Sequence, residues 1–339
     1  MSDAFVEVAR KLGLTRGTSG VLRLSFVHGV LDGVKVRARW GDRGYPVEAL
    51  IDPPLDLGLD VQRVGVVPRV SVKRKIWLYD SNWDMEVDGL CDEPLRANKL
   101  LEGDARRAVL GLNATHADIA VNDESVGVFV LQADEESLER AFRAVARTAK
   151  ILDEARRKVP PAKAVAEHAK ELSRFADAKG LGTTDTPLAA WGELGEARLQ
   201  VAFPRTGFRE NAVVAHIGPL EGSLGPGLLV RRETMVDRVR TFLGGQDLKT
   251  GDAVFDPAFL VQAAEAERAL AALDGDARAL LLDLRRRFQE VTLDDQGLTL
   301  RAAASRVPAG EIGALLEIGC AVVESVARAS GAVRKGAYR

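Results

Sequence analysis

Apolar and polar residues alternate with a period of two in several short stretches of the chain. The clearest is GVKVRARW, residues 33–40, and the stretches 21–31 and 46–51 around it follow the same pattern. Successive side chains of a strand point to opposite faces, so this alternation predicts strands with one buried face. Residues 197–203 and 212–217 show the same alternation in the second half of the chain.

Four other stretches repeat their apolar residues every three to four positions, which predicts amphipathic helices. They are residues 4–13, 136–158, 167–180 and 309–330. The first and third stretches end at Gly13 and Gly180. Glycine is favoured directly after a helix because it adopts the left-handed conformation without a steric penalty, so we expect both helices to end there.

One stretch of the chain occurs twice. LDGDARALLLDL, residues 273–284, repeats LEGDARRAVLGL, residues 101–112, in a register that pairs Leu273 with Leu101 and leaves seven of twelve positions identical. The match continues without a gap into residues 118–128 and 290–300, where apolar, acidic and turn positions coincide. Both of these later segments predict a hairpin with Asn, Asp or Gly at its turn. A match of this length favours an internal duplication.

Upstream of the repeat, Asp88-x-x-Cys91 aligns with Asp252-x-x-Phe255, and the second copy then has eight extra residues before the repeated leucine. Within the repeat, Asp104 and Asp276 each follow a glycine at the beginning of a predicted helix. Aspartate is favoured at an N-cap because its carboxylate accepts backbone N–H groups, so we expect these two residues to cap the helices. The repeated helix is rich in leucine and is interpreted as a structural core helix.

These patterns predict an α+β protein made of two tandem copies of one helix–strands–helix–hairpin–helix domain, with antiparallel sheets. The adjacent prolines 160 and 161 end one helical pattern before another begins. The predicted parts are a first domain at 1–158, a Pro-containing linker at 159–166, a second domain at 167–330 and a basic tail at 331–339.

Residues 250–262, TGDAVFDPAFLVQ, place Phe255 and Phe259 four positions apart, before a predicted helix and a hairpin. This arrangement resembles an uncharacterised bacterial domain family with an F-x-x-x-F segment. The order of elements is also similar to that of type III secretion chaperone-like folds. The first resemblance implies no assigned activity, and the second implies a role in binding proteins rather than in catalysis.

Composition narrows the class of protein further. Lys and Arg number 47 and Asp and Glu 49, a net charge of -2, which makes no strong electrostatic case for binding nucleic acid or a membrane surface. No apolar run approaches the roughly 20 residues of a membrane-spanning helix, and the N-terminal residues do not resemble a signal peptide. Cys91 and Cys320 lie far apart, so we expect two free thiols and a cytoplasmic protein.

Motifs for common reactions are missing from the sequence: it contains no G-x-x-x-x-G-K-[ST], no G-x-S-x-G and no H-E-x-x-H. Asp80, Asn82 and Asp84 have the spacing of a calcium loop, but Met85 replaces its turn glycine and Cys91 its bidentate glutamate. We therefore predict no catalytic centre, no cofactor and no metal site. The short basic runs 73–75 and 285–287 are interpreted as solvated faces unless they converge in space.

These features favour a non-catalytic cytoplasmic protein-interaction module, an adaptor, regulator or chaperone-like scaffold whose two copies present a pseudo-dimeric surface to an unknown protein partner. The alternative is a small-molecule-binding or enzymatic domain with a pocket. Trp77, Tyr79 and Trp83 alternate along one segment. If that segment is extended, the three rings lie on one side and contribute to a partner surface or to the packing between the copies. Otherwise they fill the core of the first copy.

Overall fold

The computed structural model describes residues 3–19, 24–39, 44–65, 73–131, 134–206, 210–220, 223–224, 227–232 and 248–330. The chain divides into two compact units, residues 1–160 and 161–339. The division lies between the two adjacent prolines, inside the stretch expected to be the linker. The basic tail expected at 331–339 lies outside the described residues.

The first unit contains the predicted order of helix, strands, helix, hairpin and helix, with two short helices and a strand that were not predicted before the repeated helix. Its described helices are α1 (Asp3–Lys11), α2 (Ser81–Glu86), α3 (Pro94–Leu100), α4 (Asp104–Thr115) and α5 (Glu135–Arg156). Its described strands are β1 (Thr15–Ser19), β2 (Leu24–Leu31), β3 (Val34–Arg39), β4 (Tyr45–Leu50), β5 (Asp60–Arg63), β6 (Arg74–Lys75), β7 (Val87–Cys91), β8 (Asp118–Asn122) and β9 (Ser125–Val130).

The second unit is built in the same order. Its described helices are η1 (Lys163–Val165), α6 (Ala166–Lys179), α8 (Ala266–Ala272), α9 (Gly275–Arg287), η2 (Ala304–Arg306), η3 (Ala309–Glu311) and α10 (Ile312–Ser330), where η marks a 3-10 helix. Its described strands are β10 (Gly182–Asp185), β11 (Leu188–Leu194), β12 (Ala197–Ala202), β13 (Arg205–Thr206), β14 (Glu210–Pro219), β15 (Leu229–Arg232), β16 (Phe259–Gln262), β17 (Glu290–Asp294) and β18 (Gly297–Ala303).

The two sheets have the same strand order. The first is β1-β2-β3-β4-β9-β8-β5-β7-β6, and the second is β10-β11-β12-β14-β18-β17-β15-β16, with β13 paired to β14 beside this path. Each strand from β1 to β9, apart from β6, therefore has a counterpart at the same place in the second sheet. The predicted α+β class with antiparallel sheets is confirmed, and the shared order agrees with two copies of one domain.

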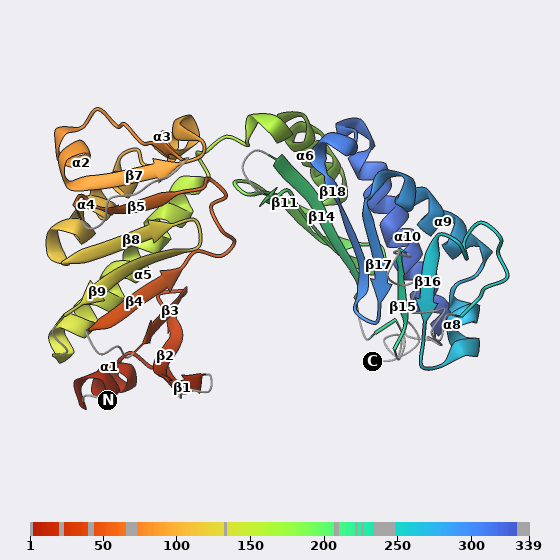
Figure 1. The fold of residues 1–339 in the computed structure, drawn as a ribbon, viewed down its shortest axis with the longest axis horizontal. Coiled ribbons are helices and arrows are strands. Elements are labelled where there is room, and N and C mark those ends of the chain that lie inside the picture. The colour runs from red at the N-terminus through yellow and green to blue at the C-terminus, as the bar shows by residue number, and fades with distance from the viewer. Residues whose placement is uncertain are drawn as a thin grey trace. The chain divides into compact units, whose positions relative to one another are not determined.

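One long helix covers each sheet. Figure 1 shows α5 lying across the strands of the first sheet, and α10 contacts β12, β14 and β18 of the second. The side of α5 that faces the core presents Leu138, Phe142, Val145 and Leu152, which recur at helical spacing and are fully buried. In β3 the predicted alternation holds, because Val36 and Ala38 are buried while their polar neighbours are not.

The register of the repeat, which pairs Leu101 with Leu273, extends further upstream than the sequence alignment indicated. The helix α3 begins at Pro94 and α8 at Ala266, and both Asp80 and Asp252 accept backbone N–H groups two and three residues ahead of them. Asp252 therefore corresponds to Asp80, not to Asp88. The eight extra residues inferred from the sequence do not exist, because the alignment had paired the wrong two aspartates.

The predicted helix caps need a correction as well. Asp104 and Asp276 are not N-caps: they lie in the first turns of α4 and α9. The cap of α9 is Asp274, whose carboxylate accepts the N–H of Ala277 at 2.8 Å, and the residue before α4 is Gly103, which has no side chain to offer. A carboxylate in the first turn is still favourable there because it faces the positive end of the helix dipole.

The shared aspartate of the hairpin turn anchors a distant loop. Asp123 lies after β8, and its carboxylate accepts the backbone N–H groups of Leu57, Gly58 and Leu59, the shortest at 2.7 Å. In the second unit Asp295 accepts those of Gly227 and Leu228 at 2.8 Å. This shared arrangement pairs backbone donors of a distant loop with a carboxylate, which gives the aspartate a structural role in both units.

Candidate functional site

The three aromatic residues singled out in the sequence do not lie on one side of an extended segment. Trp83 is fully buried in the core of the first unit, whereas Trp77 is 50% and Tyr79 94% exposed. The reason is local: Asp80 caps the helix α2, and this helix turns Trp83 inward. The interpretation that Trp83 belongs to a partner surface is therefore wrong, and Trp77 and Tyr79 remain as candidates.

Tyr79 has an unfavourable backbone conformation as well as an exposed ring. Its φ is 53°, in the left-handed region that disfavours residues other than glycine. In the register of the repeat the second unit has Gly251 at this position, with a φ of 79°. The turn thus has the same shape in both units, and glycine would form it without strain. The fold gains nothing evident from a tyrosine at this position.

Trp77 lies between a cation and the helix α3. The Nζ atom of Lys75 lies 4.4 Å from the centre of the Trp77 ring, a cation–π contact, and Asn98 of α3 donates to the Trp77 carbonyl at 3.1 Å. The exposed aromatic segment is thereby attached to α3. The next residues of that helix, Lys99 and Leu100, line a groove.

This groove runs between α4 and α5 and has a volume of about 1290 Å³. Small residues on the two helices make much of its lining: Ala105, Ala108, Gly111, Ala144, Thr148 and Ala155. A Cβ atom added at Gly111 would meet no other atom within 4 Å, so the groove is open at this point. Its volume exceeds the range of about 300–1,000 Å³ that is usual for small-molecule pockets.

Positive charge predominates along the groove. Among its acidic residues, Glu102 pairs with Lys99 at 2.8 Å, and Asp104 pairs with Arg107. Four further basic side chains have no ion pair within the part of the chain that the structure describes: Arg147, Lys150, Arg157 and Lys158. Glu154 is the remaining acidic residue of the lining. The groove therefore presents an excess of cations to a ligand.

The sequence contained a signal for this groove that the repeat obscured. Ala108, Gly111 and Thr115 recur at helical spacing, so small side chains follow one another along one stripe of α4. At the corresponding positions α9 has Leu280, Asp283 and Arg287. The two helices thus bury apolar residues at three corresponding positions, 105, 109 and 112 in α4 and 277, 281 and 284 in α9, and differ at the positions that line the groove.

Histidines and cysteines are held in separate places. The Nε2 atom of His168 lies 2.8 Å from the Val307 carbonyl, His216 contacts Thr299, and His28 stacks on a phenylalanine ring. Burial, with a smaller contribution from Arg140, lowers the pKa of His116. Burial raises the pKa of both Cys91 and Cys320 to about 12. Within the described ranges, no group of three or more His, Cys, Asp or Glu could hold a metal ion.

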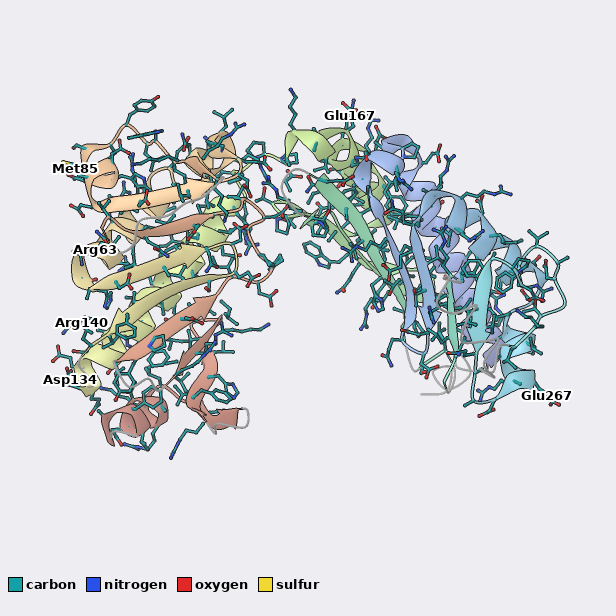
Figure 2. The ribbon with its side chains drawn as sticks, in the orientation of Figure 1. Arg63, Met85, Asp134, Arg140, Glu167 and Glu267 are labelled. Atoms are coloured by element: carbon teal, nitrogen blue, oxygen red, sulfur yellow. The ribbon has the colours of Figure 1, made fainter. Side chains whose placement is uncertain are left out.

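Figure 2 shows Met85, another exposed apolar residue, on α2 at the edge of the first unit. Within the described part of the chain, no helix combines the length and the apolar character that crossing a membrane requires.

Comparisons with known proteins add little. No family model matches the chain, and no curated protein shows significant similarity to it. Among solved structures, the mycobacterial trehalose monomycolate transport factor A, TtfA, is similar over 46% of this chain and 94% of its own, with 11% identity and a TM-score of 0.35. A similarity this low does not indicate a shared function.

Proposed function

We propose that the chain is a non-catalytic cytoplasmic protein-interaction module, an adaptor, regulator or chaperone-like scaffold, whose first unit binds an acidic segment of a partner protein. Tyr79 is the observation that carries this proposal. A tyrosine here has a strained backbone and an exposed ring, and Gly251 shows that the same turn forms without it. Local strain that the fold does not require is typical of functional positions.

Exposed aromatic residues and the groove of the first unit indicate the chemistry of the partner. Exposed aromatic residues are enriched at protein interfaces, where their large apolar area is buried on binding. The groove between α4 and α5 is of a size for a peptide segment, and its small residues leave room for a helix or an extended chain. Its excess of cations favours an acidic partner, because opposite charges steer association.

The test measures how much of a partner protein each variant of the intact chain captures from a lysate of its native host. Immobilised wild type, Tyr79→Gly and Gly111→Trp are compared at equal loading, with captured proteins quantified by mass spectrometry. Tyr79→Gly removes the ring and relieves a strain of about 1 kcal/mol, so we expect unchanged or higher thermal stability together with reduced capture. Gly111→Trp fills the groove and should reduce capture of the same protein.

Two matched controls separate the site from general effects. Ala114→Trp adds the same ring to α4 at an exposed position outside the groove, and Trp191→Ala removes a 46% exposed aromatic from the second unit. Both should capture normally. The captured protein should contain an acidic segment whose deletion abolishes binding. Undiminished capture by Tyr79→Gly, or no specific capture by the wild type, would overturn the proposal.

A further inference from the structure

Five arginines from three elements converge in the second unit. The helix α9 ends with Arg285, Arg286 and Arg287, the strand β15 ends with Arg232, and the 3-10 helix η2 ends with Arg306. All five line one cavity of about 400 Å³. The triple arginine run is thus more than a solvated helix face, because it meets cations from elsewhere in the chain.

The carboxylates nearby neutralise only part of this charge. Arg287 pairs with Glu311 at 2.9 Å and Arg286 with Asp283 at 3.6 Å. Arg232, Arg285 and Arg306 make no ion pair with any residue that the structure describes. Among the described residues, three guanidinium groups around one cavity therefore have no carboxylate partner.

Uncharged contacts hold these three side chains in place. The Arg232 guanidinium donates to the backbone carbonyl of Gln289 at 3.3 Å. The side-chain amide of Gln289 is oriented so that its oxygen accepts from Arg306 at 3.2 Å. The Arg285 guanidinium lies 6.0 Å from the centre of the Phe259 ring, and its buried Nε atom has no hydrogen-bond partner. Contacts of this kind orient the cations without neutralising them.

The fold alone does not explain the cluster. Cations near the end of a helix complement its dipole, but that dipole amounts to only about half an elementary charge. In the first unit, residues 113–115 replace the triple arginine with Asn, Ala and Thr in the register of the repeat. Arg63, at the end of β5, corresponds to Arg232 at the end of β15. Like Arg232, it donates to a backbone carbonyl, that of Ala117, at 3.1 Å. The domain therefore folds without the other arginines.

We infer that this cavity binds a small molecule that carries a diphosphate group. Its volume lies in the range usual for small-molecule pockets, about 300–1,000 Å³. Guanidinium groups match phosphate oxygens with paired N–H donors, and these charged hydrogen bonds are stronger than neutral ones. Three guanidinium groups without an ion pair among the described residues match the charge of a diphosphate better than that of a single phosphate. The inference rests on the second unit and is independent of the proposed partner site.

Isothermal titration calorimetry of the full chain with inorganic pyrophosphate tests the inference. We expect saturable one-site binding, with orthophosphate and sulfate weaker by about tenfold or more because each offers fewer charged contacts. Arg285→Gln and Arg306→Gln should each weaken pyrophosphate binding by about tenfold, with little change in the melting temperature of the unliganded protein. Arg306→Lys keeps the charge and should bind with intermediate affinity.

Arg63→Gln is the matched control, because it removes the corresponding arginine of the first unit, where the cluster is absent. It should bind pyrophosphate like the wild type. Absence of pyrophosphate binding at millimolar concentration, or equal weakening by Arg63→Gln, would overturn the inference. So would binding to a single-stranded oligonucleotide or to vesicles containing phosphatidic acid without binding to pyrophosphate, because the cavity would then serve a polymer or a membrane.

Discussion

The guanidinium of Arg106 lies 3.2 Å from the carboxylate of Asp80, which also caps the helix α2. The same relationship recurs at the matching positions of the second unit, where Arg278 lies 3.3 Å from Asp252. In both units this ion pair joins the repeated helix to the short capped segment. In each unit the aspartate of the pair comes shortly before a fully buried aromatic residue, Trp83 or Phe255. The ion pair therefore helps to hold this ring in the core.

Asp80→Ala should destabilise the first unit by about 1 kcal/mol or more, because the cap and the ion pair are both lost. Asp80→Asn keeps an oxygen that can cap the helix and should cost less. Urea unfolding followed by circular dichroism measures both. Arg107→Gln, which removes an exposed pair with Asp104, should change stability hardly at all. Equal losses for Ala and Asn would show that the cap contributes nothing.

Trp83→Ala should destabilise the first unit by about 3–5 kcal/mol, because it leaves a cavity where a fully buried ring was. Trp77→Ala removes a ring that is 50% exposed, so its effect should be much smaller. The comparison is made by guanidinium chloride unfolding of the two variants. A similar loss for both would mean that Trp77 supports the fold and is not available to a partner.

The pKa of Asp123 is raised above its ordinary value because burial disfavours the charged carboxylate, even though three backbone N–H groups oppose this effect. The folded state then binds this proton more tightly than the unfolded state does. The stability of the wild type relative to Asp123→Asn should therefore be greatest below the unfolded pKa. It should fall as pH rises through the folded pKa.

Asp134 provides a control of opposite sign. The backbone N–H of Ser137 is the main cause of a lowered pKa at Asp134. The stability that Asp134 contributes is therefore fully present above its unfolded pKa and is lost as pH falls through its folded pKa. Urea unfolding of the wild type, Asp123→Asn and Asp134→Asn across a pH series distinguishes the two. A carboxyl titration by NMR that places the Asp123 pKa below that of a model peptide would contradict the first prediction.

Cys91 and Cys320 should not react with thiol reagents in the folded protein. Burial raises the pKa of each thiol to about 12, and only the thiolate is nucleophilic. At about pH 8, iodoacetamide should leave the native chain unmodified and label both residues in concentrated guanidinium chloride. Mass spectrometry of the intact protein counts the adducts. Rapid labelling of either cysteine without denaturant would show that its segment opens readily.

The apolar periodicity of the sequence predicted the helix α1, the strands β2 to β4, the helix α4, the hairpin of β8 and β9 and the helix α5, because burial follows that periodicity. It did not predict the short helices α2 and α3 or the strand β7 between them. Asp104 was wrongly placed at a cap, since residue preferences do not distinguish neighbouring positions at the beginning of a helix. The sequence left open whether Trp83 lies at a surface or in the core, because alternation indicates one face only in an extended chain; the short capped helix α2 interrupts the segment and places Trp83 in the core.

The candidate binding sites were less predictable. Arg232 and Arg306 meet the triple arginine of α9 only through the pairing of β15 with β17 and the course of the chain after β18. A run of arginines in a sequence does not reveal which distant cations it will face. The strain at Tyr79 likewise depends on a backbone angle, and the glycine at the matching position of the second unit was hidden because the sequence alignment had paired Asp252 with Asp88.

The unbroken register between residues 80–130 and 252–302 makes these two segments equivalent building blocks of their units. Because each block lies at the same place in its sheet, one could be transplanted into the other half with its neighbours in register. Such a chimaera would carry Arg285, Arg286 and Arg287, at the end of α9, into the first unit that contains Arg63, but would leave Arg306 behind. Exchanging the two segments would therefore place the residues of the groove or of the arginine cluster in the other unit, next to different neighbours.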